Sequence, residues 1–146
     1  IIAAIAIPNL LAARRSANEG SAVSAMRTLH GAQMTYASTY GSGNYAGATS
    51  FDGTALSALG TPGLIDSVLA TGTKSGYNFV GARVASSATA PATFAFSAIP
   101  STTSGVTATG ARRFGVSTDG VLKADTTVAS QYATVAAVEG ASPMSN

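Results

Sequence analysis

Residues 1–15 read IIAAIAIPNLLAARR, an apolar run that a single asparagine interrupts and that ends abruptly at Arg14 and Arg15. A domain in water gains nothing from exposing such a run, because burying apolar surface contributes about 25 cal/mol per Å². We therefore expect these residues to be buried in a bilayer, in another protein or against further copies of the same chain.

The apolar run is too short to cross a membrane alone, since a spanning helix needs about 20 apolar residues. The chain does not begin with Met. The end of the run continues into a helical pattern, unlike a cleaved secretory signal, which gives way to a turn and a strand. We interpret residues 1–13 as the second half of a longer apolar helix that remains attached to the protein and begins upstream of Ile1.

Residues 14–40 predict the amphipathic continuation of this helix. Arg15 and Glu19 are four residues apart, so we expect a weak ion pair between them. The helix should end near Gly41, where the glycine-rich stretch GSGNYAG begins. Apolar residues recur at steps of three and four, which is one face of a helix; they are Ala22, Ala25, Met26, Leu29, Ala32, Tyr36 and Tyr40.

The stretch IIAAIAIPNLLAARRSANEGSAVSAMRTLHGAQMTYAS resembles the N-terminal helix of bacterial type IVa pilins and of the related pseudopilins. In that family an apolar run leads into Ala-x-Ala-Ile-Pro-Asn-Leu and then into a basic amphipathic helix. The resemblance implies a processed, N-methylated first residue and an early glutamate used in assembly, all of which would lie upstream of Ile1. It also implies a pilin-like α+β fold.

Pro8 is the expected break in this helix, because an internal proline removes a hydrogen bond and costs about 3 kcal/mol. Two interpretations stay open. Pro8 kinks the rod or occupies the first turn of a helix that starts at Asn9. Alternatively, as the resemblance implies, the stretch before Pro8 is unwound inside a filament, and residues 1–7 are then at least partly non-helical there.

The remainder of the chain predicts a head on this rod, so that the fold class is α+β. Residues 41–76 form a connecting loop, with short helices over 54–59 and 64–70. Residues 77–146 form the head and its tail, where we expect a roughly four-stranded antiparallel sheet. Asp119-Gly120 is the strongest hairpin signal. The expected strands cover residues 77–84, 92–99, 113–117 and 120–124.

The apolar face of the sheet should cover the long helix. Phe94 and Phe96 alternate with smaller residues and therefore share one face of their strand. We expect them to pack against Met26, Leu29 and Tyr36. Residues 101–110 should be a polar, flexible loop, and residues 126–146 suit either a strand or a short helix.

The composition gives little material for catalysis or metal binding. Only 10% of residues are charged, the formal net charge is +2, and there is no cysteine. Disulfides and thiol chemistry are excluded, and His30 as the sole imidazole makes a zinc site or a Ser-His-Asp triad improbable. Asp119 and Asp125 flank a turn where some pseudopilins bind calcium, but two carboxylates are too few. We expect no enzyme, no cofactor and no metal.

Four groups of side chains could carry interactions. Arg14 and Arg15 suit an interface or simple solvation. The Ser/Thr-rich stretch 101–109 could carry O-linked glycans. Aromatic residues near the end of the helix suggest packing, and they are Tyr36, Tyr40, Tyr45 and Phe51.

A hairpin bearing Arg112, Arg113 and Lys123 could contact DNA phosphates, although three cations give only weak, salt-sensitive binding. The leading hypothesis is structural: a major pilin that polymerises with itself into an extracellular filament. Before assembly the subunit would be held in the inner membrane, and it would depend on pilus assembly machinery. Adhesion or motility would be activities of the filament.

The alternatives are a type II secretion pseudopilin, and a minor pilin or adhesin that binds DNA or a surface. In the leading hypothesis the apolar helix forms the filament core. The expected interface residues are Ile1, Ile2, Ile5, Ile7, Pro8, Leu10 and Leu11.

Overall fold

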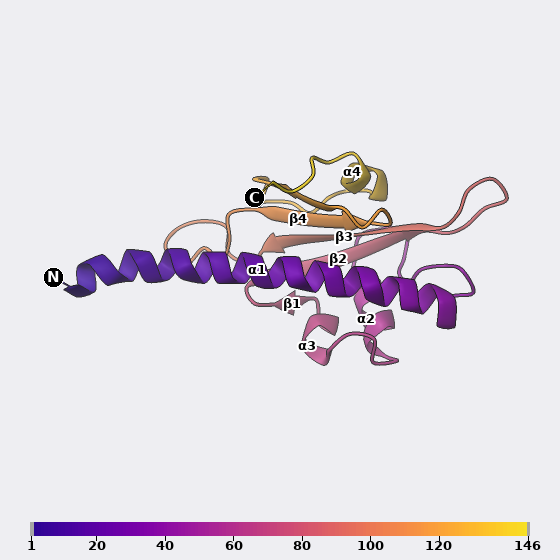
Figure 1. The fold of residues 1–146 in the computed structure, drawn as a ribbon, viewed down its shortest axis with the longest axis horizontal. Coiled ribbons are helices and arrows are strands. Elements are labelled where there is room, and N and C mark those ends of the chain that lie inside the picture. The colour runs from indigo at the N-terminus through magenta and orange to yellow at the C-terminus, as the bar shows by residue number, and fades with distance from the viewer. Residues whose placement is uncertain (1, 146) are drawn as a thin grey trace.

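The structure is a computed structural model that describes residues 2–145, without the side chains of Ile2, Ala3, Ile5 and Ala6. It contains a long helix, a five-stranded antiparallel sheet and three short helices. Figure 1 shows the long helix lying along one face of the sheet and projecting beyond it at the N-terminal end. The α+β class and the antiparallel sheet are confirmed, with five strands rather than four.

Helix α1 (Ile2–Thr39) passes through Pro8 without interruption. A start at Asn9 is therefore wrong, and the unwinding of residues 2–7 stays a prediction for an assembled filament. With 38 residues the helix is about 57 Å long at 1.5 Å per residue. It ends at Thr39, close to the predicted Gly41, whose amide donates to the Tyr36 carbonyl at 2.8 Å.

The strands follow one another in a simple antiparallel meander, in the order β1-β2-β3-β4-β5. The strand missed by the sequence is β1, whose two residues are too few to show an alternating pattern. Two predicted strands have the observed bounds, one is shifted by a residue, and the last begins at residue 122 instead of 120. The strands are β1 (Thr73–Lys74), β2 (Tyr77–Val84), β3 (Thr93–Pro100), β4 (Arg113–Ser117) and β5 (Leu122–Asp125).

Three short helices complete the fold. Helix α2 (Thr54–Gly60) lies where it was predicted. Helix α3 (Ser67–Ala70) starts later than the predicted residue 64, because the Asp66 carboxylate caps it by accepting from the Leu69 amide at 3.2 Å. Helix α4 (Val135–Glu139) decides the open question in the tail in favour of a helix.

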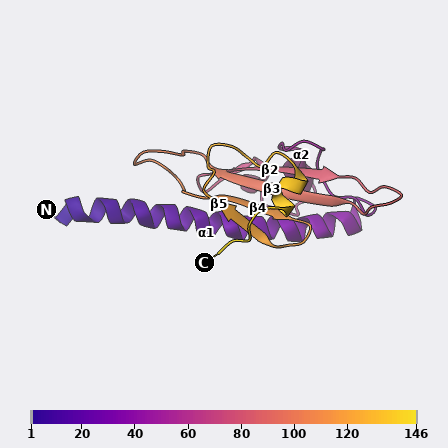
Figure 2. The same cartoon turned by 90° about the horizontal axis from the view of Figure 1, so that it is seen from above.

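The sheet has an apolar cluster on each face. On one face Met26 and Leu29 of α1 pack in a core that includes Phe94 and Phe96, all four fully buried, while Tyr36 is half-buried at its margin. On the opposite face the tail with α4 covers the sheet, as Figures 1 and 2 show. The buried residues there are Ala82, Ala95, Tyr132, Val135 and Val138.

The tail is held by hydrogen bonds as well as by packing. The buried Lys123 donates from Nζ to the carbonyls of Glu139 at 3.2 Å and Ala141 at 3.3 Å. The Ser97 hydroxyl accepts from the Tyr132 amide at 3.0 Å. These contacts fix the last segment to the sheet in a chain that has no cysteine.

Candidate functional site

The candidate site is the N-terminal part of α1, where apolar side chains face solvent. Ile7 is 56% exposed and Leu10 is 59% exposed. Figure 2 shows this part of the helix projecting past the head. Among the α1 side chains that the structure describes, Ala22 is the first in the buried core, so the helix changes near there from a largely exposed rod to a part of the head.

Four of the predicted interface residues have described side chains. Ile7, Pro8 and Leu10 are exposed, and Leu11 is half-buried. Ile1 lies outside the described residues, as do the side chains of Ile2 and Ile5. Across the described part of the chain, no helix is both long and apolar enough to span a membrane.

A groove of about 460 Å³ lies beside this exposed segment. One wall is the helix, which contributes Ile7, Leu11 and Arg14, and the other is the loop between β3 and β4. That loop places Val106 at the groove with 71% of its surface exposed. The uncovered apolar surface therefore extends from the helix onto the head.

Arg15 binds this loop rather than Glu19, so the predicted Arg15–Glu19 ion pair is wrong. Its Nη2 donates to the Gly105 carbonyl at 2.9 Å and its Nε to the Ala108 carbonyl at 3.2 Å. Asn18 adds a hydrogen bond from Nδ2 to the Thr109 carbonyl at 3.0 Å.

Glu19 is engaged with the end of the same loop. Its carboxylate accepts from the Ala111 amide at 2.9 Å and lies 3.2 Å from Nη2 of Arg112. The Tyr77 hydroxyl donates to the Arg112 carbonyl at 2.9 Å. Burial and the nearby charge of Glu19 raise the pKa of Tyr77, so this hydroxyl stays protonated and remains a donor.

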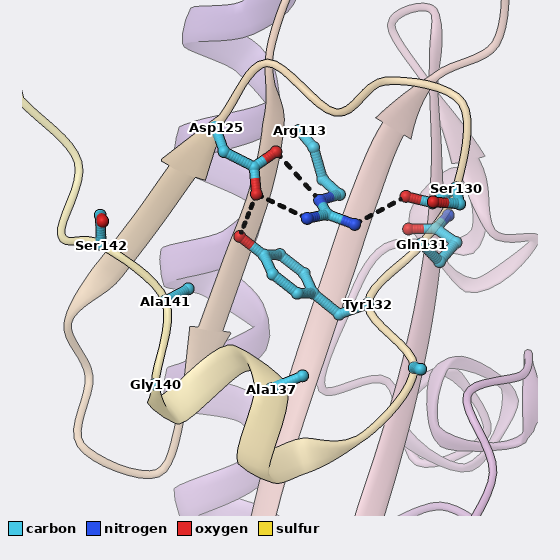
Figure 3. A pocket seen from close by; sticks show the side chains of 10 residues that line it. Arg113, Asp125, Ser130, Gln131, Tyr132, Ala137, Gly140, Ala141 and Ser142 are labelled. Atoms are coloured by element: carbon cyan, nitrogen blue, oxygen red, sulfur yellow. Dashed lines mark hydrogen bonds and ion pairs between the residues drawn. The ribbon is translucent and has the colours of Figure 1, made fainter.

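A second hollow, of about 590 Å³, opens on the opposite face beneath the tail (Figure 3). Arg113 forms an ion pair with Asp125 and its guanidinium lies 3.7 Å from the centre of the Tyr132 ring. Burial opposes ionisation of Asp125, but hydrogen bonds from Arg113 and the Thr127 amide outweigh it and lower the pKa of the carboxyl.

The polar groups of this hollow bind one another. All three guanidinium nitrogens of Arg113 have partners, two on Asp125 and one on the Ser130 carbonyl. The Tyr132 hydroxyl also donates to Asp125, at 3.1 Å. The cluster therefore fastens the tail to β4 and β5 and gives each guanidinium nitrogen a partner within the protein.

The three cations of the hairpin do not form one basic patch. Arg112 pairs with Glu19 on the helix side, whereas Arg113 pairs with Asp125 beneath the tail. Lys123 is 5% exposed and lies 3.8 Å from Asp119. Each cation thus has a carboxylate neighbour, and little free charge remains for a phosphate backbone.

His30 and the acidic residues have structural partners. The ring of His30 lies 5.5 Å from that of Phe94, with Nε2 at 3.4 Å from the Thr118 carbonyl. Asp119 accepts from the Ser117 hydroxyl at 2.8 Å. Within residues 2–145, no group of three His, Cys, Asp or Glu side chains could hold a metal ion.

The aromatic residues near the end of α1 divide into separate contacts. The rings of Tyr36 and Tyr40 lie 5.9 Å apart beside a shallow hollow at Pro62. The ring of Tyr45 is tilted against that of Phe94, with 4.6 Å between ring centres, whereas Phe51 packs against the cluster beneath the tail. They are therefore divided among three packing sites.

The sequence analysis missed the main polar contacts, but one of them carried a signal. Arg113 and Asp125 are equally distant from Asp119, so a hairpin turn there places them opposite each other, as observed. Nothing comparable indicates the contacts of Arg15 and Glu19, whose partners lie more than ninety residues away.

Comparison of the chain with protein-family models, with curated proteins and with solved structures found no match. The N-terminal segment, with the apolar surface that it exposes, is therefore the feature of the molecule that bears on its function.

Proposed function

We propose that this chain is a structural subunit, a major pilin, that polymerises through its apolar N-terminal helix into an extracellular type IV pilus filament. One observation carries the proposal: the first part of α1 presents large apolar side chains to solvent, while the second part buries one face in the head. Surface of that kind marks a site where another molecule binds.

Several features indicate that the exposed apolar surface of α1 binds other copies of the same chain. The exposed residues lie on a helix that projects from the head (Figure 1), so helices of many copies can pack together at one axis. A contact between two different surfaces of identical subunits builds an open helical filament when its rotation does not close into a ring. Alternating Ala and Ile side chains over residues 3–7 suit close helix packing.

Before assembly, the same residues would hold the subunit in the inner membrane as part of a longer apolar helix. Assembly then exchanges lipid for protein around the helix. The pilus assembly machinery would bind the subunit transiently. Adhesion, motility or surface contact would then be activities of the assembled filament.

The test is expression of the full chain in cells that carry type IV pilus machinery and lack their own major pilin. We expect sheared filaments that contain this protein, and we expect Leu10→Asp to abolish them, because a carboxylate cannot be buried unpaired in an apolar core. Val84→Asp is the matched control, since Val84 is 51% exposed on the head.

The thermal midpoint of the purified full chain should be the same for both variants. Filaments of normal length and number from Leu10→Asp would refute the proposal. So would an equal loss of filaments in Val84→Asp, because the defect would then not be specific to the helix.

A further inference from the structure

The loop between β3 and β4 exposes one large apolar side chain within a polar sequence. Residues 101–110 read STTSGVTATG, and Val106 is the only large apolar residue among them. Val106 is the most exposed of the large apolar side chains that the structure describes, at 71%. It faces the groove whose other wall contains Ile7 and Leu11.

Helix α1 anchors this loop from three positions. Asn18 and Glu19 lie three and four residues after Arg15, so all three are on one face of the helix. Together they bind the second part of the loop, through the carbonyls of Gly105, Ala108 and Thr109 and the amide of Ala111.

Two glycines let the loop approach the head closely. Gly76 has φ of +75°, and a Cβ there would lie 2.7 Å from Cβ of Thr109. A Cβ on Gly110 would lie 2.1 Å from the Tyr77 hydroxyl oxygen. Contacts below 3.0 Å require something to shift, so the helix, the turn at Gly76 and the loop are closely interlocked.

We propose that Arg15, Asn18 and Glu19 are positioning residues that hold this loop as the second wall of the assembly surface, so that a second copy of the chain contacts Val106 as well as the helix. The inference rests on the proposed function and extends the filament interface from the helix to the head.

The occupant is a second copy because the groove is continuous with the exposed surface of α1 through Ile7 and Leu11. Apolar side chains line both walls, and Arg14 is the charged group at the groove. The apolar segment of another copy has matching chemistry, since it contains no charged residue before Arg14. Such a contact joins the projecting helix of one copy to the head of the next.

The absence of cysteine from the chain permits a direct test by cross-linking. Val106→Cys and Leu10→Cys are introduced together, and assembled filaments are oxidised and analysed without reductant. We expect a ladder of covalent oligomers that neither single variant gives. The control pair is Leu10→Cys with Ser87→Cys, which places the second cysteine on the exposed turn between β2 and β3.

The role of Arg15 in positioning the loop is tested by adding Arg15→Met to the variant that carries Val106→Cys and Leu10→Cys. We expect the cross-linked fraction to fall about tenfold, because two charge-assisted hydrogen bonds to the loop are lost. Arg15→Lys should restore part of it. Arg83→Met is the matched control, since Arg83 also donates to a loop carbonyl, that of Gly47 at 2.6 Å, away from the groove.

The thermal midpoint of each protein is measured in parallel to separate positioning from general stability. An equal ladder with Arg15→Met, or filaments without any Val106 cross-link, would overturn this inference and leave the proposed function intact. If the cysteine pair itself fails to assemble, the positions of Val106 and Leu10 in a helical reconstruction of unsubstituted filaments decide the question. Absence of filaments from the unsubstituted chain would instead refute the proposed function.

Discussion

The two halves of α1 belong to one uninterrupted helix but have opposite surroundings. In the second half Met26 and Leu29 are fully buried against the sheet. In the first half Ile7 and Leu10 are more than half exposed. One half buries its apolar face within the chain, whereas the other half leaves large apolar side chains uncovered, and the proposed function gives these a partner in other copies.

The change between the halves coincides with a polar junction. Arg15, Asn18 and Glu19 bind the loop between β3 and β4 just before Ala22 enters the core. The junction therefore marks where the head ends and where the proposed assembly surface begins. Each of the following predictions tests one side of this division.

The largest expected effect on stability comes from Leu29→Ala. Removing a fully buried leucine leaves a cavity and should cost about 2–5 kcal/mol in the free energy of unfolding. Leu10→Ala should cost less than about 0.5 kcal/mol, since Leu10 is exposed in the single chain. Chemical denaturation of the two variants measures both values. Equal losses would contradict the division of the helix.

Gly110→Ala should disrupt the junction itself. The new methyl group would overlap the Tyr77 hydroxyl, and we expect a loss of about 1–3 kcal/mol from the resulting strain. Hydrogen exchange should show faster exchange at the Ala111 amide, which donates to Glu19. Unchanged protection of that amide would mean that the junction tolerates the shift.

Acid should weaken the head through Asp125 and leave the projecting segment unaffected. The folded state lowers the pKa of Asp125, so its contribution is present above the unfolded pKa and is lost as pH falls through the folded pKa. The thermal midpoint should therefore fall as the pH drops through the ordinary carboxyl pKa of 3.8 and below it. Asp125→Asn should reduce this fall, with an effect under about 1 kcal/mol because the side chain is partly exposed. An identical pH profile for the variant would exclude Asp125 as the cause.

The smallest expected effect is a gain in stability from Gly31→Ala. A Cβ at Gly31 would meet nothing within 4 Å, and alanine favours a helix over glycine by about 0.5–1 kcal/mol. A Cβ at Gly20 would also meet nothing within 4 Å, so we expect the same gain from Gly20→Ala. A thermal melt of the single chain measures both, and a loss of stability would show that one of these positions needs glycine.

The sheet shows how far local pattern can predict structure. The strands β2 and β4 have alternating or apolar sequences bounded by turn residues, and their predicted bounds match those observed. The two-residue β1 has no such pattern, and the later start of α3 depends on the Asp66 cap. These elements depend on contacts that residue spacing does not reveal.

The sequence by itself determined the long helix, its apolar and amphipathic parts, and the antiparallel hairpins, because these follow from residue periodicity and from turn residues close together in the chain. Only the tertiary structure decided that Arg15 and Glu19 bind the distant loop and that Lys123 is buried beneath the tail. The physical reason is that a charged side chain binds whichever carbonyl or carboxylate folding brings near it, and that neighbour can lie anywhere in the chain.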